Sequence, residues 1–168
     1  MPERFRRNFL KDKESKALLA EASIRLKANV QQLLKPKTGI ELVETDYAKV
    51  YLADGKPIMA RTQGNLFPTL LFAEFVTLAP KAVVDMGAIP FVCKGANVMR
   101  PGIRRFNGDF AEGDMLFVVD EKYGRPLVVG EALMGKDEAE KGTQGPVIKN
   151  LHFVGDRVWN LMKELTSQ

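Results

Sequence analysis

The chain has 168 residues, of which 45% are hydrophobic and 27% charged, and its formal net charge is +4. These values are ordinary for globular proteins and exclude a chain that is disordered by composition. Because no apolar run reaches about 18 residues, we expect no membrane-spanning helix. Because the basic start lacks a continuous apolar stretch, we expect no signal peptide.

The first predicted elements are an arm and a long helix. Residues 1–10 alternate arginine with phenylalanine and are predicted to form an arm that could dock through its aromatic rings. Over residues 12–34 apolar side chains recur at spacings of three or four, which is typical of an amphipathic helix. Asp12 or Ser15 could cap its start, and Pro36 prevents its continuation.

A small sheet with one more helix follows. Strands are predicted over residues 40–43, 49–52 and 57–61. Asp54 and Gly55 stand between the last two strands, and Asp-Gly is a strong hairpin signal. Residues 65–68 introduce a short helix over 69–78, whose apolar side chains, Leu78 among them, are expected to pack on the sheet.

The pattern changes after Pro80, where we place the boundary between two domains, residues 1–80 and 81–168. Strands are then expected over residues 83–84, 97–99, 115–119, 126–134 and 147–153, and short helices over 88–93, 137–141 and 157–165. Many short strands separated by glycine turns are typical of a small barrel. The predicted fold class is therefore α+β, a small helix-plus-antiparallel-sheet N-terminal domain followed by a β-barrel.

The positive charge gathers at the start of the chain. Residues 1–39 contain ten Lys/Arg and four Asp/Glu, a net charge of +6, and the remaining residues have a net charge of −2. A basic segment of this kind suits the phosphate backbone of a nucleic acid. A solvated helix face that only aids solubility explains the same charge equally well.

The second half resembles the PUA domain, named for pseudouridine synthase and archaeosine transglycosylase. Five sequence blocks carry the resemblance over about 75 residues in the order typical of the family. They are Val84–Ala88, Gly95–Gly102, Gly113–Leu116, Gly124–Ala132 and His152–Trp159. The resemblance implies a β-barrel that binds RNA.

The first half is similar to the pre-PUA domain of the malignant-T-cell-amplified-sequence family. Asp54–Pro57 and Gly64–Leu70 carry this resemblance. Eukaryotic members commonly have extra cysteines, so with Cys93 as its only cysteine the chain looks more like an archaeal relative. The resemblance implies binding to the small ribosomal subunit, with a density-regulated-protein-like factor as partner in initiation, reinitiation or recycling.

The segment from residue 94 to 105 contains four basic residues and no acidic one. In PUA domains the equivalent helix, loop and following strand form the RNA groove. The resemblance therefore implies that RNA contacts Lys94, Gly95, Ala96, Asn97, Arg100, Pro101, Gly102, Arg104 and Arg105. Arginine can bind a phosphate or stack on a base, whereas the glycines and the proline are also explained by a barrel turn.

A second basic cluster in the first 13 residues could contact ribosomal RNA. Its members are Arg4, Arg6, Arg7, Lys11 and Lys13. A solvated tail is an equally good interpretation of this cluster.

The other polar residues that attract notice are better explained structurally. His152, the only histidine, lies in a predicted strand without an obvious Ser or Cys partner, and Asp156 is expected to cap the last helix, with Trp159 in the core. Asp85 and Asp114 stand beside turn glycines, where carboxylates bond the backbone.

Catalysis is not expected from this sequence. One cysteine and one histidine cannot assemble the usual zinc site, and no nucleotide-binding glycine loop is visible. We expect a cytoplasmic protein without metal or cofactor that binds tRNA or rRNA. An accessory role in RNA modification and a protein-docking module for a translation factor are the alternatives.

Overall fold

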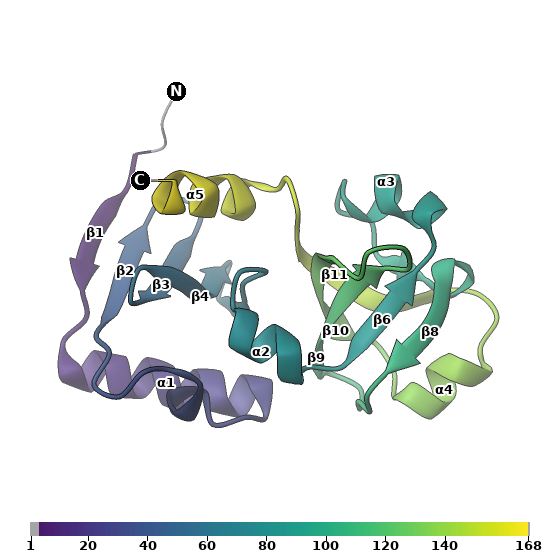
Figure 1. Cartoon of the computed structure of the whole chain (residues 1–168), viewed down its shortest axis with the longest axis horizontal. Helices are drawn as coiled ribbons and strands as arrows, with labels where there is room; N and C mark the ends of the chain where they lie inside the picture. The colour runs from purple at the N-terminus through teal and green to yellow at the C-terminus, as the bar shows by residue number, and fades with distance from the viewer. Residues whose placement is uncertain (1–3, 168) are drawn as a thin grey trace.

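A computed structural model of the chain describes residues 4–167. Two β-sheet domains lie side by side along the long axis of the molecule (Figure 1). The first contains a five-stranded sheet in the order β1-β2-β3-β4-β5, and the second a six-stranded sheet in the order β7-β11-β10-β9-β6-β8. The predicted α+β class is confirmed. None of the described helices is long and apolar enough to span a bilayer.

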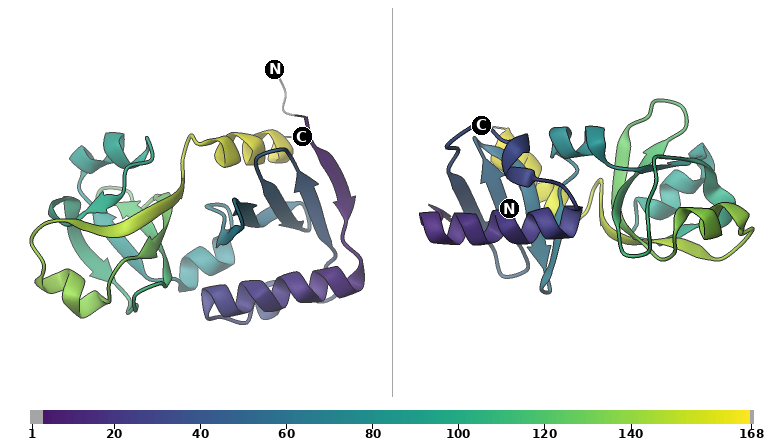
Figure 2. Two further views of the ribbon diagram at one scale, coloured as in Figure 1. Left: turned by 180° about the vertical axis from the view of Figure 1, so that it is seen from behind. Right: turned by 90° about the horizontal axis from the view of Figure 1, so that it is seen from below.

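The first sheet is antiparallel throughout and lies between two helices. Its strands are β1 (Arg6–Phe9), β2 (Ile40–Glu44), β3 (Lys49–Ala53), β4 (Lys56–Thr62) and β5 (Asn65–Pro68). Helix α1 (Asp12–Leu26) runs along one side, and the C-terminal helix α5 (Arg157–Thr166) lies on the other (Figures 1 and 2). Leu161 and Met162 of α5 are fully buried in the same core as Ala22 of α1. The core of the first domain therefore contains residues from both ends of the chain.

The long helix predicted over 12–34 is wrong in its length, because it is interrupted after Leu26. Lys27 adopts a left-handed backbone conformation, with φ of 52°, which ends α1. The Ser23 hydroxyl then accepts a hydrogen bond from the Val30 N–H at 3.0 Å. A separate 3₁₀ turn, η1 (Val30–Leu33), continues the apolar stripe in a new direction.

Within the predicted N-terminal arm, Arg6–Phe9 form strand β1 of the first sheet, whereas residues 1–3 lie outside the described part of the chain. Strand β1 pairs antiparallel with β2, with Arg7 opposite Val43. The Arg7 guanidinium forms a forked ion pair with Glu41, at 2.6 and 3.1 Å. Because every residue of β1 remains exposed, the hydrophobic pattern gave no signal for this strand.

The segment after β4 forms a second hairpin that the sequence analysis did not predict. Gln63 and Gly64 have φ values of 49° and 82°, close to the 53° and 76° of the predicted Asp54-Gly55 turn. Two consecutive positive φ angles are typical of the tight turn that joins two antiparallel strands. Helix α2 (Ala73–Leu78) accordingly begins later than expected, and Leu78 faces solvent instead of the sheet.

The second sheet curls into a half-barrel. Its strands are β6 (Lys81–Val84), β7 (Val98–Met99), β8 (Ile103–Asn107), β9 (Met115–Asp120), β10 (Pro126–Ala132) and β11 (Pro146–Phe153). Strand β6 pairs parallel with β9, and all other pairs are antiparallel. Strand β8, which was not predicted, is an edge strand beside β6. Short helices α3 (Ile89–Val92) and α4 (Lys136–Lys141) flank the barrel (Figure 1).

Candidate nucleic-acid interface

A pocket of about 300 Å³ opens at the end of the barrel where β6 ends and β8 begins. It lies between α3, with the preceding 3₁₀ turn η2 (Met86–Ala88), and β7, with the following turn η3 (Arg100–Gly102). Its lining residues are Asp85, Gly87, Ala88, Phe91, Val92, Asn97, Val98, Met99, Pro101 and Gly102. We call this cavity the barrel pocket.

Close backbone packing builds one wall of the barrel pocket. The Asp85 N–H donates to the Gly102 carbonyl at 2.9 Å, and the Asp85 carboxylate accepts the Ala88 N–H at 2.8 Å. A Cβ at Gly102 would lie 3.2 Å from the Ala88 Cβ. Glycine at this position therefore lets the two turns approach, and Asp85 serves the turn, as the sequence predicted.

Residues 94–97, which we call the rim, follow α3 and end at Asn97 in the lining of the barrel pocket, and they are bonded to β11. The Asn150 amide donates to the carbonyls of Val92 and Ala96, both at 2.9 Å, and the Asn97 carboxamide accepts the Asn150 N–H at 3.0 Å. Gly95 has φ of 100°, a conformation that other residues rarely adopt. Hydrogen bonds with Asn150 therefore hold the rim against β11.

Apolar side chains at the mouth of the pocket are exposed. Phe91 is 68% exposed, and Met86 and Met99 also face solvent. The sequence predicted a helix here but not its exposure, which depends on neighbours that a short apolar run does not specify. An exposed aromatic ring beside a cavity is suited to stacking against a flat ligand.

The four cations of the predicted site have different environments. Lys94 and Arg105 are exposed and form no side-chain hydrogen bond or ion pair within residues 4–167, whereas Arg104 pairs with Glu121 at 3.0 Å. The Arg100 guanidinium instead donates to the carbonyl of Ala139 at 2.7 Å and to that of Ile103 at 2.9 Å. Its side chain is therefore occupied in linking β8 to α4.

The structure thus brings together most of the predicted RNA-contacting residues. Asn97, Pro101 and Gly102 line the barrel pocket, residues 94–96 belong to the rim, and Arg104 and Arg105 begin the adjoining strand β8. RNA contact at these positions remains a prediction. For Arg100 the geometry favours a structural role.

The second predicted cluster lies at the opposite end of the molecule, around β1 and the start of α1 (Figure 1). Arg7 is held by Glu41, and Arg6 lies 3.6 Å from Glu44. Arg4, Lys11 and Lys13 are exposed. This cluster cannot contribute to the surface of the barrel pocket, so any RNA contact here would be separate.

The remaining polar residues take structural positions. His152 is fully buried, and its Nδ1 lies 2.8 Å from the Asp156 carboxylate. Asp156 caps α5 by accepting the Trp159 N–H at 2.7 Å, as predicted. Asp114 accepts a turn N–H, also as predicted.

Burial raises the pKa of the half-buried Cys93 thiol. Within residues 4–167 no group of three potential ligands could hold a metal ion.

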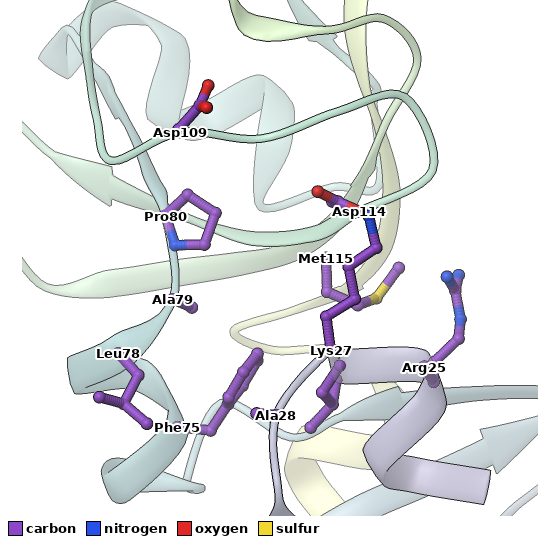
Figure 3. A pocket seen from close by; sticks show the side chains of 11 residues that line it. Arg25, Lys27, Ala28, Phe75, Leu78, Ala79, Pro80, Asp109, Asp114 and Met115 are labelled. Carbon is purple, nitrogen blue, oxygen red and sulfur yellow. Dashed lines mark ion pairs between the residues drawn. The ribbon is translucent and has the colours of Figure 1, made fainter.

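A second cavity, of about 330 Å³, lies where the two domains meet (Figure 3). Two of its basic side chains form ion pairs across the junction. Lys27 lies 2.6 Å from Asp114, and Arg25 donates to the Gly113 carbonyl at 3.0 Å and pairs with Glu131 at 3.3 Å. These contacts join the end of α1 to the barrel, so we interpret this cavity as part of the domain junction.

Comparison with known proteins defines the class. Residues 80–154 match the PUA domain family, and residues 6–74 match a domain of unknown function, DUF1947. A PUA-domain structure from Aeropyrum pernix covers 96% of this chain and 93% of its own, with a TM-score of 0.85 and 27% identity. The structure of a hypothetical protein of Pyrococcus horikoshii aligns with 94% of this chain over 99% of its own length, with a TM-score of 0.77 and 30% identity. The chain is a PUA-domain protein with a DUF1947 domain in front.

Curated relatives identify the family. An uncharacterized protein of Methanocaldococcus jannaschii is 38% identical, covering 92% of this chain and 96% of its own. Translation machinery-associated protein 20 of Saccharomyces cerevisiae is 31% identical over 89% of this chain and 87% of its own length. Malignant T-cell-amplified sequence 1 of Danio rerio is 30% identical, covering 79% and 76%. The chain belongs to the malignant-T-cell-amplified-sequence family. This confirms the resemblance seen in the sequence, including its archaeal character.

Proposed function

We propose that the protein binds RNA without catalysing a reaction and that it acts in the cytoplasm with the translation machinery. Its RNA would be small-subunit rRNA or tRNA, bound at the barrel pocket. Family membership supports the link to translation, because relatives along most of the chain are named as translation machinery-associated proteins.

The observation that carries this proposal is that an apolar pocket and two exposed cations, unpaired within residues 4–167, belong to neighbouring segments of the barrel. Phe91 and the pocket wall offer an apolar surface for a base. Lys94 in the rim and Arg105 in β8, which follows the lining residue Gly102, are exposed and available for phosphates. Single-stranded RNA is recognised by this combination of stacking and phosphate contact. Because hydrogen bonds with Asn150 already hold the rim, less ordering of this segment is needed on binding.

The RNA that is bound determines the step of translation in which the protein acts. Binding to the small subunit would place the protein in initiation, reinitiation or recycling, with a density-regulated-protein-like factor as partner. Binding to tRNA would also fit an accessory role in RNA modification. Both roles need the same RNA-binding surface, so the surface is tested first.

The experiment is a titration of the protein against small ribosomal subunits and against total tRNA, at two salt concentrations. Lys94→Ala combined with Arg105→Ala removes two exposed cations at the barrel pocket. Lys16→Ala combined with Lys56→Ala removes two exposed cations from the first domain and is the matched control. We expect about a tenfold or greater loss of affinity in the first variant only, with a weaker salt dependence.

Equal loss in both double variants would show that only net charge matters and would contradict the site. Wild-type protein that binds neither RNA would contradict RNA binding itself. Catalytic turnover of an RNA would contradict the proposal that the protein is not an enzyme.

A protein-docking function is the second candidate, favoured by strand β1. This strand is at the edge of its sheet, so its outer backbone groups are unpaired within residues 4–167, and Phe9, its last residue, is exposed. An exposed strand edge is a template for pairing with a partner. Binding of a density-regulated-protein-like factor that is lost in Phe9→Ser, with RNA binding retained, would support this candidate.

A further inference from the structure

The turn between β9 and β10, residues 121–125, carries an exposed aromatic ring. Tyr123 at its tip is 60% exposed, and Lys122 and Arg125 beside it are also exposed. Neither core cluster contains Tyr123. The RNA site expected from the family resemblance does not include this turn.

The turn is held in one shape by a buried carboxylate. Asp120 accepts the N–H groups of Lys122 and Arg125, both at 3.0 Å, and also the N–H of Tyr123. Gly124 takes the positive φ, 68°, that completes the turn. The backbone therefore presents the Tyr123 ring to solvent without any contribution of the ring to the fold.

Two cations lie near the Tyr123 ring without tight contact with it. Lys122 Nζ is 5.2 Å and Arg125 Cζ 4.9 Å from the ring centroid. Elsewhere in the molecule, Arg157 stacks on Tyr47 at 3.7 Å. Exposed cation–π contacts at the longer distances are weak, so a flat ligand can displace a cation from the Tyr123 ring.

The turn belongs to the same end of the barrel as the barrel pocket. Val84, the last residue of β6, pairs with Asp120, the last residue of β9, in the parallel ladder, and the Glu121 N–H donates to the Val84 carbonyl at 2.9 Å. Glu121 also pairs with Arg104 of the predicted RNA site. The turn and helix α3 lie at the same end of the barrel in Figure 1.

We propose that Tyr123 stacks on an unpaired base of the bound RNA while Lys122 and Arg125 contact the adjacent phosphates. The ligand class is therefore single-stranded RNA, which spans the barrel pocket and the β9–β10 turn. This inference rests on the proposed RNA-binding function and extends its surface to residues outside the predicted site.

The charge of the turn favours RNA over a protein partner. Glu121 is already paired with Arg104, so the exposed charge beside Tyr123 is that of Lys122 and Arg125. Two cations beside one aromatic ring match the alternation of phosphate and base along a single strand. A duplex keeps its bases stacked inside and offers no face to the ring.

The test compares wild type with Tyr123→Ala and Tyr123→Phe. The probes are a mixed-sequence single-stranded RNA of about 12 nucleotides, a typical site size, and a duplex of the same length. Tyr123→Ala is expected to bind the single strand roughly 5- to 100-fold more weakly, the range that base stacking supplies. Tyr123→Phe keeps the ring and is expected to bind as wild type, and the duplex is expected to bind all three proteins equally weakly.

Salt dependence separates the roles of the ring and the cations. Tyr123→Ala is expected to leave the slope of log affinity against log salt unchanged, because no phosphate contact is removed. Lys122→Gln combined with Arg125→Gln is expected to reduce the slope by about two. A reduced slope in Tyr123→Ala would overturn the stacking role.

The outcomes also separate this inference from the proposed function. If wild type binds no RNA, both fail. If wild type binds the single strand and Tyr123→Ala binds it equally well, the stacking inference alone is overturned. Loss of small-subunit binding by Tyr123→Ala with unchanged binding to the single strand would mean that the ring contacts a ribosomal protein, which also overturns it.

Discussion

Nδ1 of His152 lies 2.8 Å from a carboxylate oxygen of Asp156, at the point where the barrel ends and the C-terminal helix turns back to the first domain. A carboxylate can only accept, so Nδ1 carries the proton. The same oxygen accepts the Phe153 N–H at 2.9 Å, and the other oxygen caps α5 through Trp159. One side chain thus fixes both the buried histidine and the start of the helix that completes the first core.

Asp156→Ala is therefore expected to destabilise the whole chain. It removes a helix cap and leaves a buried imidazole N–H without its acceptor, together worth about 2–4 kcal/mol. Urea unfolding measures the loss. Asp156→Asn keeps an oxygen for the cap and is expected to lose less. Equal stability of Asp156→Ala and wild type would contradict the role of this carboxylate.

Asp120 makes stability depend on pH. Burial of this carboxyl opposes ionisation, but hydrogen bonds from the turn N–H groups outweigh burial and lower its pKa. The charged form is thus favoured by folding, so its contribution is present at neutral pH and is lost as pH falls below about 4. Asp120→Asn, whose amide places a donor against the N–H groups, is expected to cost about 1–3 kcal/mol at pH 7.

The measurement is the urea midpoint between about pH 3 and pH 7, around the ordinary aspartate pKa. Wild type is expected to lose stability on acidification more steeply than Asp120→Asn. Parallel curves for the two proteins would show that this carboxyl is not the source of the dependence.

Local signals made much of the fold predictable. The Asp54-Gly55 hairpin was predicted because two residues encode a turn with two positive φ angles. Strand β1 could not be predicted, because its residues are all exposed and its pairing depends on Glu41, 34 residues away. The end of α1 at Lys27 depends on a non-glycine residue in a left-handed conformation, which spacing does not reveal.

The candidate site was predictable to the extent that motifs mark it. The glycines and cations of residues 94–105 were predicted to contact RNA because their sequence resembles a family, and this contact remains a prediction. A motif does not show which hydrogen bonds a side chain forms or how exposed it is. Arg100 is bound to a carbonyl 39 residues away, and Tyr123 and Phe91 are exposed because of how neighbouring turns pack.

Gly130 is expected to tolerate no side chain. It lies at an irregularity in the pairing of β10 with β11, and a Cβ there would approach a methyl of the fully buried Ile148 to 2.2 Å. Gly130→Ala is expected to cost about 2–3 kcal/mol through overpacking. In Gly142→Ala the new Cβ would lie 3.5 Å from its nearest neighbour, so this control is expected to change stability by less than about 0.5 kcal/mol in the same urea titration.

Substitutions of Arg100 and Arg105 are expected to have different effects, the first on the stability of the fold and the second on the affinity for RNA. Arg100→Ala breaks two hydrogen bonds to the carbonyls of Ala139 and Ile103 and is expected to cost about 2 kcal/mol, while the affinity of the folded protein for RNA changes by less than about twofold. Arg105→Ala removes an exposed cation and is expected to weaken RNA binding without changing the urea midpoint. The reverse pattern would assign Arg100 to RNA and Arg105 to the fold, because each variant removes one positive charge and they differ only in what that charge contacts.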